Sequence, residues 1–87
     1  MSRAMQDEIK FSRRGRRERT DCAERMIWLS RCGRYRIVRS RYLYGRLPEV
    51  YYAQVLDGGC WDVISQHRKR LPAEAACRKH TKRTGFV

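Results

Sequence analysis

The β-branched and aromatic residues of this chain concentrate between residues 34 and 66. Three short runs, at residues 35–44, 50–56 and 60–65, are rich in Val, Ile, Tyr and Trp and are separated by turn residues. Such runs are typical of β-strands, and the Asp-Gly-Gly sequence at 57–59 supplies the positive φ angles that a tight hairpin needs. The pattern predicts an antiparallel sheet.

The segment after the third run predicts a helix over residues 71–80, because a proline fits its first turn and alanines fill its middle. Ala73, Ala76 and Cys77 fall on one face of that helix, and this stripe of small residues would let the helix lie close to a sheet. Small Ala53 suggests the side of the sheet where the helix packs. The fold class is therefore α+β, a small antiparallel sheet of three or four strands with one C-terminal helix packed on a face.

Residues 21–33 allow two interpretations. Asp21, with Glu24 three residues later, forms a capping-box pattern that favours a helix. Residues 26–31 instead lead through Gly33 directly into the next run, which favours a strand and a hairpin. We favour the strand, which would be the fourth. The buried face of the sheet is also left open, because along residues 35–42 each alternate set mixes apolar residues with arginine.

A chain of 87 residues corresponds to one domain with a thin core. Residues 1–20 hold few large apolar side chains, so we expect a disordered basic tail there and a single sheet-plus-helix domain over residues 21–87. The tail ends in a run of arginines that could add phosphate contacts, namely Arg13, Arg14, Arg16, Arg17 and Arg19.

The charge of the chain points to a polyanionic partner. Lys and Arg number 21 against 9 Asp and Glu, which gives a net charge of +12. The excess lies in residues 1–20, 34–56 and 66–83, and most of it is arginine, whose guanidinium group binds phosphate through two nitrogens and stacks on bases. These features predict a nucleic-acid-binding module.

Residues 35–41 match the pattern Y-R-x-V-R-x-R position by position. Together with residues 51–55, Trp61 and the alanine-rich stretch 73–76, they resemble the AP2 and integrase-type DNA-binding domains, in which a helix backs a three-stranded antiparallel sheet. The resemblance implies that DNA, rather than RNA, is the ligand. It also implies the residues that contact it from the sheet, which are Arg36, Arg39, Arg41 and Trp61.

A second resemblance is to the double-stranded RNA-binding domain, and it requires residues 21–31 to be helical. The basic cluster of that family, which lies over phosphates at the start of its second helix, is similar to Arg68, Lys69 and Arg70. The loop at residues 43–49 lacks the Gly-Pro-x-His-type sequence of the family. A further alternative is a protein-interaction module that docks on an acidic partner or on a ribonucleoprotein particle.

We do not expect an enzyme, since so short a chain leaves little material for a deep cleft and neither histidine has a partnered nucleophile in the sequence. The cysteines form no CxxC pair, so we expect no metal site and no other cofactor. No long apolar run and no signal-peptide pattern occurs, from which we expect no membrane partner, reduced cysteines and a cytoplasmic location. The sequence leaves the oligomeric state open.

Overall fold

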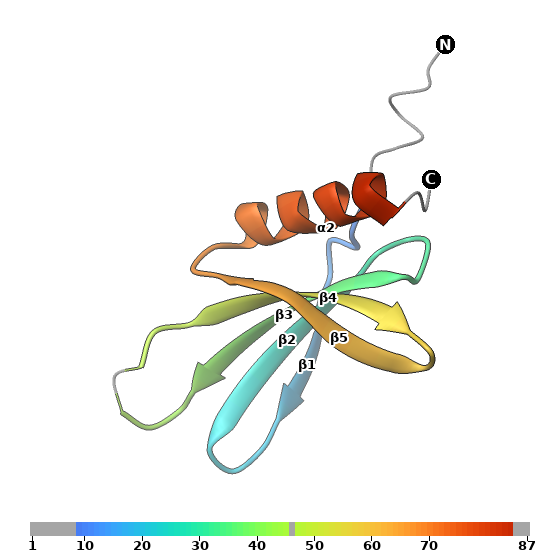
Figure 1. Ribbon diagram of the computed structural model, residues 1–87. Coiled ribbons are helices and arrows are strands. Elements are labelled where there is room, and N and C mark those ends of the chain that lie inside the picture. Colours follow the sequence, from blue (N-terminus) through green and yellow to red (C-terminus); the bar gives the residue numbers. More distant parts are fainter. Residues whose placement is uncertain (1–8, 46, 85–87) are drawn as a thin grey trace.

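The computed structural model describes residues 9–45 and 47–84, in which five antiparallel strands form one sheet and a helix lies across one face (Figure 1). In chain order the elements are β1 Arg16–Arg19, β2 Ala23–Leu29, β3 Tyr35–Tyr42, β4 Val50–Asp57, β5 Cys60–His67 and α2 Arg70–Thr84. The strands are hydrogen-bonded in this same order, so the sheet is a simple meander. The α+β class, the antiparallel sheet and the C-terminal helix are confirmed, with one strand more than the largest number predicted.

The two predicted glycine hairpins are both present. Gly33 has a φ of 78° between β2 and β3, while Gly58 and Gly59 have φ of 60° and 84° between β4 and β5. This left-handed region suits glycine because it has no Cβ. The hairpins set the registers that decide which side chains share a face.

Residues 23–29 form a strand and not a helix. β2 pairs antiparallel with β3 from Ala23 opposite Tyr42 to Leu29 opposite Arg36. Pairing with a neighbouring strand thus outweighs the capping-box pattern, as tertiary context commonly overrides local preference. The helix that the double-stranded RNA-binding topology requires at residues 21–31 is therefore not present.

Residues 9–20, which we expected to belong to a disordered tail, instead pack on the domain and include a strand. Ile9 is buried, Phe11 forms an isolated bridge with Ser30, and β1 pairs with β2 from Arg16 opposite Ile27 to Arg19 opposite Glu24. The backbone of β1 is satisfied by the edge of β2, a contribution that does not depend on apolar side chains. Residues 1–8 of the predicted tail lie outside the described residues.

The core lies between α2 and the sheet. Its buried members are Ile9, Trp28, Tyr35, Ile37, Ala53, Val55, Ala73 and Cys77. Ala53, Ala73 and Cys77 are each 0% exposed, so the close approach of helix and sheet through small side chains is confirmed. Tyr35 also joins the two layers, because its hydroxyl lies 2.9 Å from Nδ1 of His80 on α2.

A β-bulge in β5 changes which side chains share a face. Ala53 pairs with Ser65 and Gln54 pairs with Val63, so Ile64 is the extra residue. In a regular strand, residues 61, 63 and 65 would lie on one face. The bulge instead places Ser65 on the same side as Ala53 and Val63 on the opposite side, while Ile64 packs against the core.

All four cysteines are free thiols, and Cys77 is the buried one. Burial raises the pKa of Cys77 to about 12, so its thiol stays protonated and acts as a small apolar side chain. Within the described part of the chain, no helix has both the length and the apolar character needed to cross a membrane.

Candidate nucleic-acid interface

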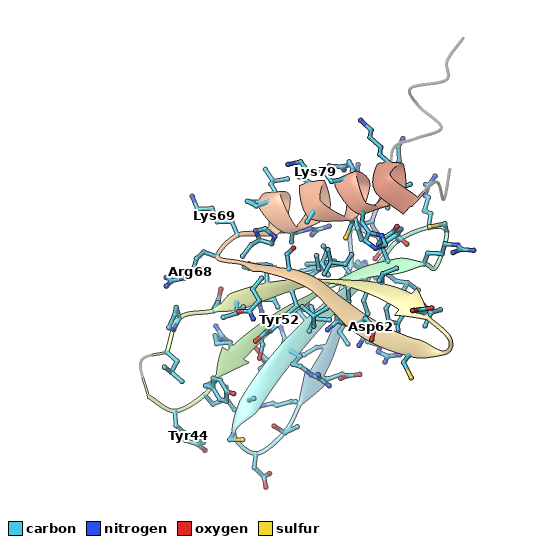
Figure 2. All side chains as sticks on the ribbon, viewed as in Figure 1. Tyr44, Tyr52, Asp62, Arg68, Lys69 and Lys79 are labelled. Carbon is cyan, nitrogen blue, oxygen red and sulfur yellow. The ribbon has the colours of Figure 1, made fainter. Side chains whose placement is uncertain are left out.

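We call the face of the sheet opposite α2 the open face. The strand registers assign to it Arg16, Glu18, Arg25, Ile27, Leu29, Arg36, Val38, Ser40, Tyr52, Gln54, Trp61 and Val63. Ile27 and Val38 are buried without belonging to the core cluster under α2, which agrees with this assignment. Figure 2 shows Tyr52 on the side of the sheet away from α2. The alternation along β3 is thereby settled, since Tyr35 and Ile37 face the helix.

Arg36 and Trp61 lie together on the open face. The guanidinium carbon of Arg36 sits 4.4 Å from the centroid of the Trp61 ring, and its Nε donates a hydrogen bond of 2.5 Å to Oε1 of Gln54. The ring and the amide hold the guanidinium group in one place, and a fixed arginine loses less side-chain entropy when it binds an anion. Both residues are among those that the resemblance implied as DNA contacts, and the structure brings them together.

Positive charges crowd around Arg36. Burial lowers the pKa of Arg36, and repulsion from Arg25 and Arg16 acts in the same direction, while Glu18 acts against it. Arginine nevertheless keeps its charge at neutral pH, so the repulsion persists in the folded protein. An anion bound at this position would relieve it.

A hollow of about 360 Å³ lies beside the Arg36–Trp61 pair, and we call it the basic pocket. Its lining residues are Ser12, Arg14, Arg16, Ile27, Leu29, Arg36 and Trp61. Three arginines surround it and none of its lining residues is acidic, while Ile27 and Leu29 supply apolar surface. Such a combination can hold a group that has both an anionic and an apolar part.

A second hollow on the open face, of about 280 Å³, lies on the other side of Gln54. It is lined by Arg25, Val38, Ser40, Tyr52, Gln54 and Val63, and we call it the tyrosine hollow. Glu18 links the arginines of the two hollows. Its carboxylate lies 3.0 Å from Arg16, which lines the basic pocket, and 3.1 Å from Arg25, which lines the tyrosine hollow. These hydrogen bonds, chiefly the one from Arg16, lower the pKa of Glu18.

Arg39 and Arg41 do not lie with Arg36, contrary to what the resemblance implied. They occupy alternate positions on β3 and so point to the other face. There the nearly buried Glu24 lies 2.8 Å from Arg41, 3.9 Å from Arg39 and 3.6 Å from Arg17. We call these four residues the Glu24 cluster. Arg41 also lies 3.7 Å from Glu49, so this set of arginines already has its counter-charges.

The basic residues before α2 separate in a similar way. Arg70 lies 4.5 Å over the Trp28 ring and donates to Glu74 at 2.7 Å and to the Ser12 carbonyl at 3.4 Å, so it ties the start of the helix to the sheet. Arg68 and Lys69 are exposed and project from the turn between β5 and α2 (Figure 2). They remain accessible to a polyanion, whereas Arg70 is a packing residue.

The arginines of the expected tail are divided by β1. Arg14 and Arg16 line the basic pocket, Arg17 belongs to the Glu24 cluster, and Arg13 and Arg19 are exposed. Gly15 fixes this segment, since a Cβ there would come within 2.6 Å of Met26 Cγ and 2.9 Å of Trp28 Nε1. The close passage of Gly15 over β2 positions its two neighbouring arginines.

Sequence reasoning missed Arg25 and Tyr52 as residues of the interface. Arg25 pairs with Ser40, and Tyr52 pairs with Val38, so both share the face of Arg36. A usable signal existed at Arg25, because a tight hairpin at Gly33 fixes the β2–β3 register and hence the alternation along β2.

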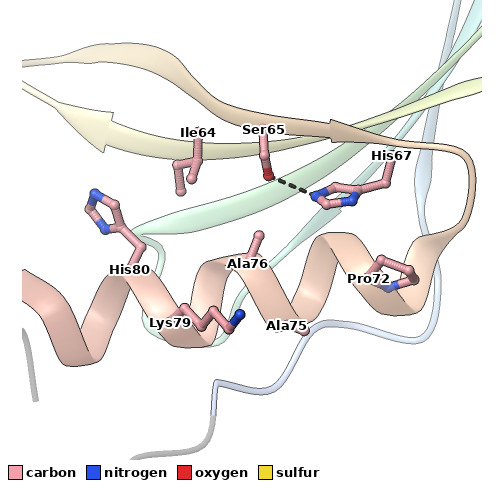
Figure 3. A pocket seen from close by; sticks show the side chains of 8 residues that line it. All are labelled: Ile64, Ser65, His67, Pro72, Ala75, Ala76, Lys79 and His80. Carbon is pink, nitrogen blue, oxygen red and sulfur yellow. Dashed lines mark hydrogen bonds between the residues drawn. The ribbon is translucent and has the colours of Figure 1, made fainter.

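A separate pocket of about 400 Å³ lies between β5 and α2 (Figure 3). Its walls include Ile64, Pro72 and Ala76, and at its edge Ser65 Oγ lies 2.7 Å from His67 Nε2. A serine and a histidine at this distance could form the first two members of a hydrolytic triad, but the lining residues include no carboxylate to orient the imidazole. Among the described residues, no group of three or more His, Cys, Asp or Glu could hold a metal ion.

Comparisons of this chain with protein-family models, with curated proteins and with solved structures found no match. The functional proposal therefore starts from the geometry and charge of the open face.

Proposed function

We propose that this protein is a nucleic-acid-binding module that uses the open face of its sheet. The observation that carries the proposal is the Arg36–Trp61 pair, fixed on an uncovered sheet face beside Arg14, Arg16 and Arg25. Of these four arginines, Arg16 and Arg25 form ion pairs with Glu18. An excess of oriented guanidinium groups beside an aromatic ring suits the phosphates and bases of nucleic acid.

DNA is the ligand we propose, in line with the resemblance to sheet-type DNA-binding domains. The resemblance to those domains implies DNA contacts for Arg36 and Trp61, which share the open face. It implies contacts for Arg39 and Arg41 as well, but their guanidinium groups surround Glu24, so we propose no direct role for them. Arg68 and Lys69, at the end of β5, add charge that a longer polyanion could reach.

Fluorescence anisotropy with labelled duplex DNA, duplex RNA and single strands at low salt tests the proposal. If the four arginines of the open face each neutralise one phosphate, the slope of log affinity against log salt should lie between roughly −3 and −4. Arg36→Ala should weaken binding by roughly 5- to 100-fold, as expected for an oriented arginine at a base or a phosphate. Arg19→Ala is the matched control, since it removes an exposed arginine that the β1–β2 register places on the other side of the sheet.

Two outcomes would overturn the proposal. One is the absence of binding to every nucleic acid tested at low salt. The other is an equal loss of affinity for Arg36→Ala and Arg19→Ala, because any cation on a protein of net charge +12 helps a little and only the open face should stand out.

A further inference from the structure

We propose that the open face binds unpaired nucleotides, with one base seated in the basic pocket and the adjoining phosphates held by the arginines around it. This inference rests on the proposed function and names its substrate class as single-stranded nucleic acid.

The basic pocket has a mixed lining of charged and apolar side chains. Phosphates alone need only cations, yet the hollow also offers Ile27, Leu29 and the ring of Trp61. Leu29 is 47% exposed, which leaves apolar surface open to water at the edge of a cationic site. A nucleobase covers such surface with a flat apolar face, while its backbone stays within reach of the charged groups.

Arg36 and Trp61 already form a stack on the open face. Arg36 covers one face of the indole at 4.4 Å, and its hydrogen bond to Gln54 holds it there. Bases stack on aromatic rings and also on guanidinium planes. A base in the pocket can therefore extend a stack that already contains one ring and one cation, with little reordering of the protein.

The basic pocket also has a neighbour of the same kind, the tyrosine hollow. The tyrosine hollow combines Tyr52 and Arg25 with the apolar side chains of Val38 and Val63, and no acidic residue lines it. Gln54 borders this hollow and accepts the hydrogen bond from Arg36, so the two hollows adjoin. Each thus pairs an aromatic residue with arginine, which suits consecutive nucleotides of one strand.

A duplex would not fill these hollows. Its bases are stacked on one another and their Watson–Crick edges are paired, so its outer surface presents mainly phosphates and groove edges. A strand whose bases can turn outward gains the apolar contacts in addition to the phosphate contacts, and the difference should be measurable as a preference.

The experiment compares three labelled probes of equal length at one salt concentration, using the full chain. They are an oligothymidine, a blunt hairpin duplex and an abasic strand that keeps the phosphates but lacks the bases. We expect the oligothymidine to bind at least about tenfold more tightly than the abasic strand and the duplex, since stacking on an aromatic surface contributes to each seated base. An oligouridine probe distinguishes DNA from RNA as the source of the strand.

Leu29→Ser tests the apolar contact without changing the charge. We expect it to reduce oligothymidine affinity by roughly three- to tenfold and to leave duplex affinity unchanged, because only a seated base covers Leu29. The control is Leu71→Ser, an exposed leucine at the start of α2 that lines neither hollow. Circular dichroism of both variants confirms that the sheet is intact.

Equal affinity for the oligothymidine, the abasic strand and the duplex would overturn this inference while leaving nucleic-acid binding in place. An equal effect of Leu29→Ser on single strand and duplex would also overturn it. If none of the probes binds at low salt, the proposed function falls as well, so the two failures are distinguishable.

Discussion

The two faces of the sheet hold arginines of similar number in opposite settings. In the Glu24 cluster, three arginines share one nearly buried carboxylate, and Arg41 has Glu49 as a second partner. On the open face, Arg14, Arg16, Arg25 and Arg36 line two hollows, and the partly exposed Glu18 pairs with Arg16 and Arg25. Both groups draw on β1 and β3, and neighbouring residues of one strand belong to different groups.

The position of an arginine in the strand alternation determines the face to which it points, and hence the groups that it contacts. Arg39 is largely buried, and its guanidinium group lies 3.9 Å from the Glu24 carboxylate, so its charge is committed to the fold. Arg36, three residues earlier, points to the other face and stacks on Trp61. We therefore expect the Glu24 cluster to contribute to stability, and it is for the open face that we propose ligand binding.

The largest expected effect is on the Glu24 cluster. Glu24→Gln keeps the shape of the side chain but removes the charge shared by Arg17, Arg39 and Arg41. Removing one partner of a buried ion pair typically costs about 3–5 kcal/mol. Since Arg17 and Arg41 are partly exposed, we expect a loss of about 2–4 kcal/mol in the free energy of unfolding, measured by urea denaturation.

Glu49→Gln is the matched control for this substitution. Among the described residues, Glu49 has one arginine partner, at 3.7 Å, and its side chain is 37% exposed, so its loss should change stability by less than about 1 kcal/mol. Similar losses for the two variants would contradict the distinction between a committed and a solvent-exposed carboxylate. Nucleic-acid affinity measured under folding conditions should not fall in either variant.

Much of the fold follows from local sequence signals. The glycines at 33, 58 and 59 mark the hairpins because each has the positive φ that a tight turn requires. Ala53, Ala73 and Cys77 indicate the packed layer because only small side chains permit the observed approach of helix and sheet. These are local signals, and each reports directly on the residue that carries it.

The parts that escaped prediction depend on contacts between distant segments. β1 is rich in arginine and has no strand-like composition, and its order derives from backbone pairing with β2 and from the burial of Ile9. The face of β3 that packs on α2 also could not be read from the sequence, because Arg39 occurs in the buried alternate set. The free-energy cost of burying the charge of Arg39 is offset by Glu24 on the neighbouring strand.

The candidate site was predictable in its chemistry but only partly in its membership. Charge and the Tyr-Arg pattern indicated arginines on the sheet, and Arg36 with Trp61 do lie together. The bulge at Ile64 sets the face of Trp61 relative to Ser65, and nothing in residues 60–67 marks the bulge. The residues that line the basic pocket and the tyrosine hollow could therefore be assigned only from the strand registers of the structure.

A smaller effect on stability concerns the exclusion of water from the layer between α2 and the sheet, where Cys77 is buried. Burial raises the pKa of Cys77 from the ordinary 9.0 to about 12. Above pH 9 the unfolded chain loses this proton first, so the stability that the buried thiol contributes is complete below about pH 9 and decreases up to about pH 12. The decrease should approach about 1.4 kcal/mol per pH unit in that window.

Other ionisable groups contribute to the same slope, so the measurement compares the wild type with Cys77→Ala. The difference between the two slopes of unfolding free energy against pH isolates the thiol. Identical slopes would show that water reaches the layer between α2 and the sheet. This layer would then not differ from the open face in its exclusion of water. A thiol reagent should likewise modify Cys22, Cys32 and Cys60 before Cys77.

The smallest effect, and the most specific to the open face, is expected at Glu18. Its carboxylate bridges Arg16 and Arg25, so it competes with a bound phosphate for the same guanidinium groups. Glu18→Gln should change the free energy of unfolding by less than about 0.5 kcal/mol, because exposed ion pairs contribute little. It should also raise nucleic-acid affinity by roughly two- to threefold, since one negative charge leaves the interface. Urea denaturation and anisotropy on the same preparation measure both quantities.

An increase in affinity with unchanged stability would be the reverse of the result expected for Glu24→Gln. A decrease in affinity would instead mean that Glu18 holds Arg16 and Arg25 in the orientation that binds, and the open-face arginines would then depend on their carboxylate as the Glu24 cluster does.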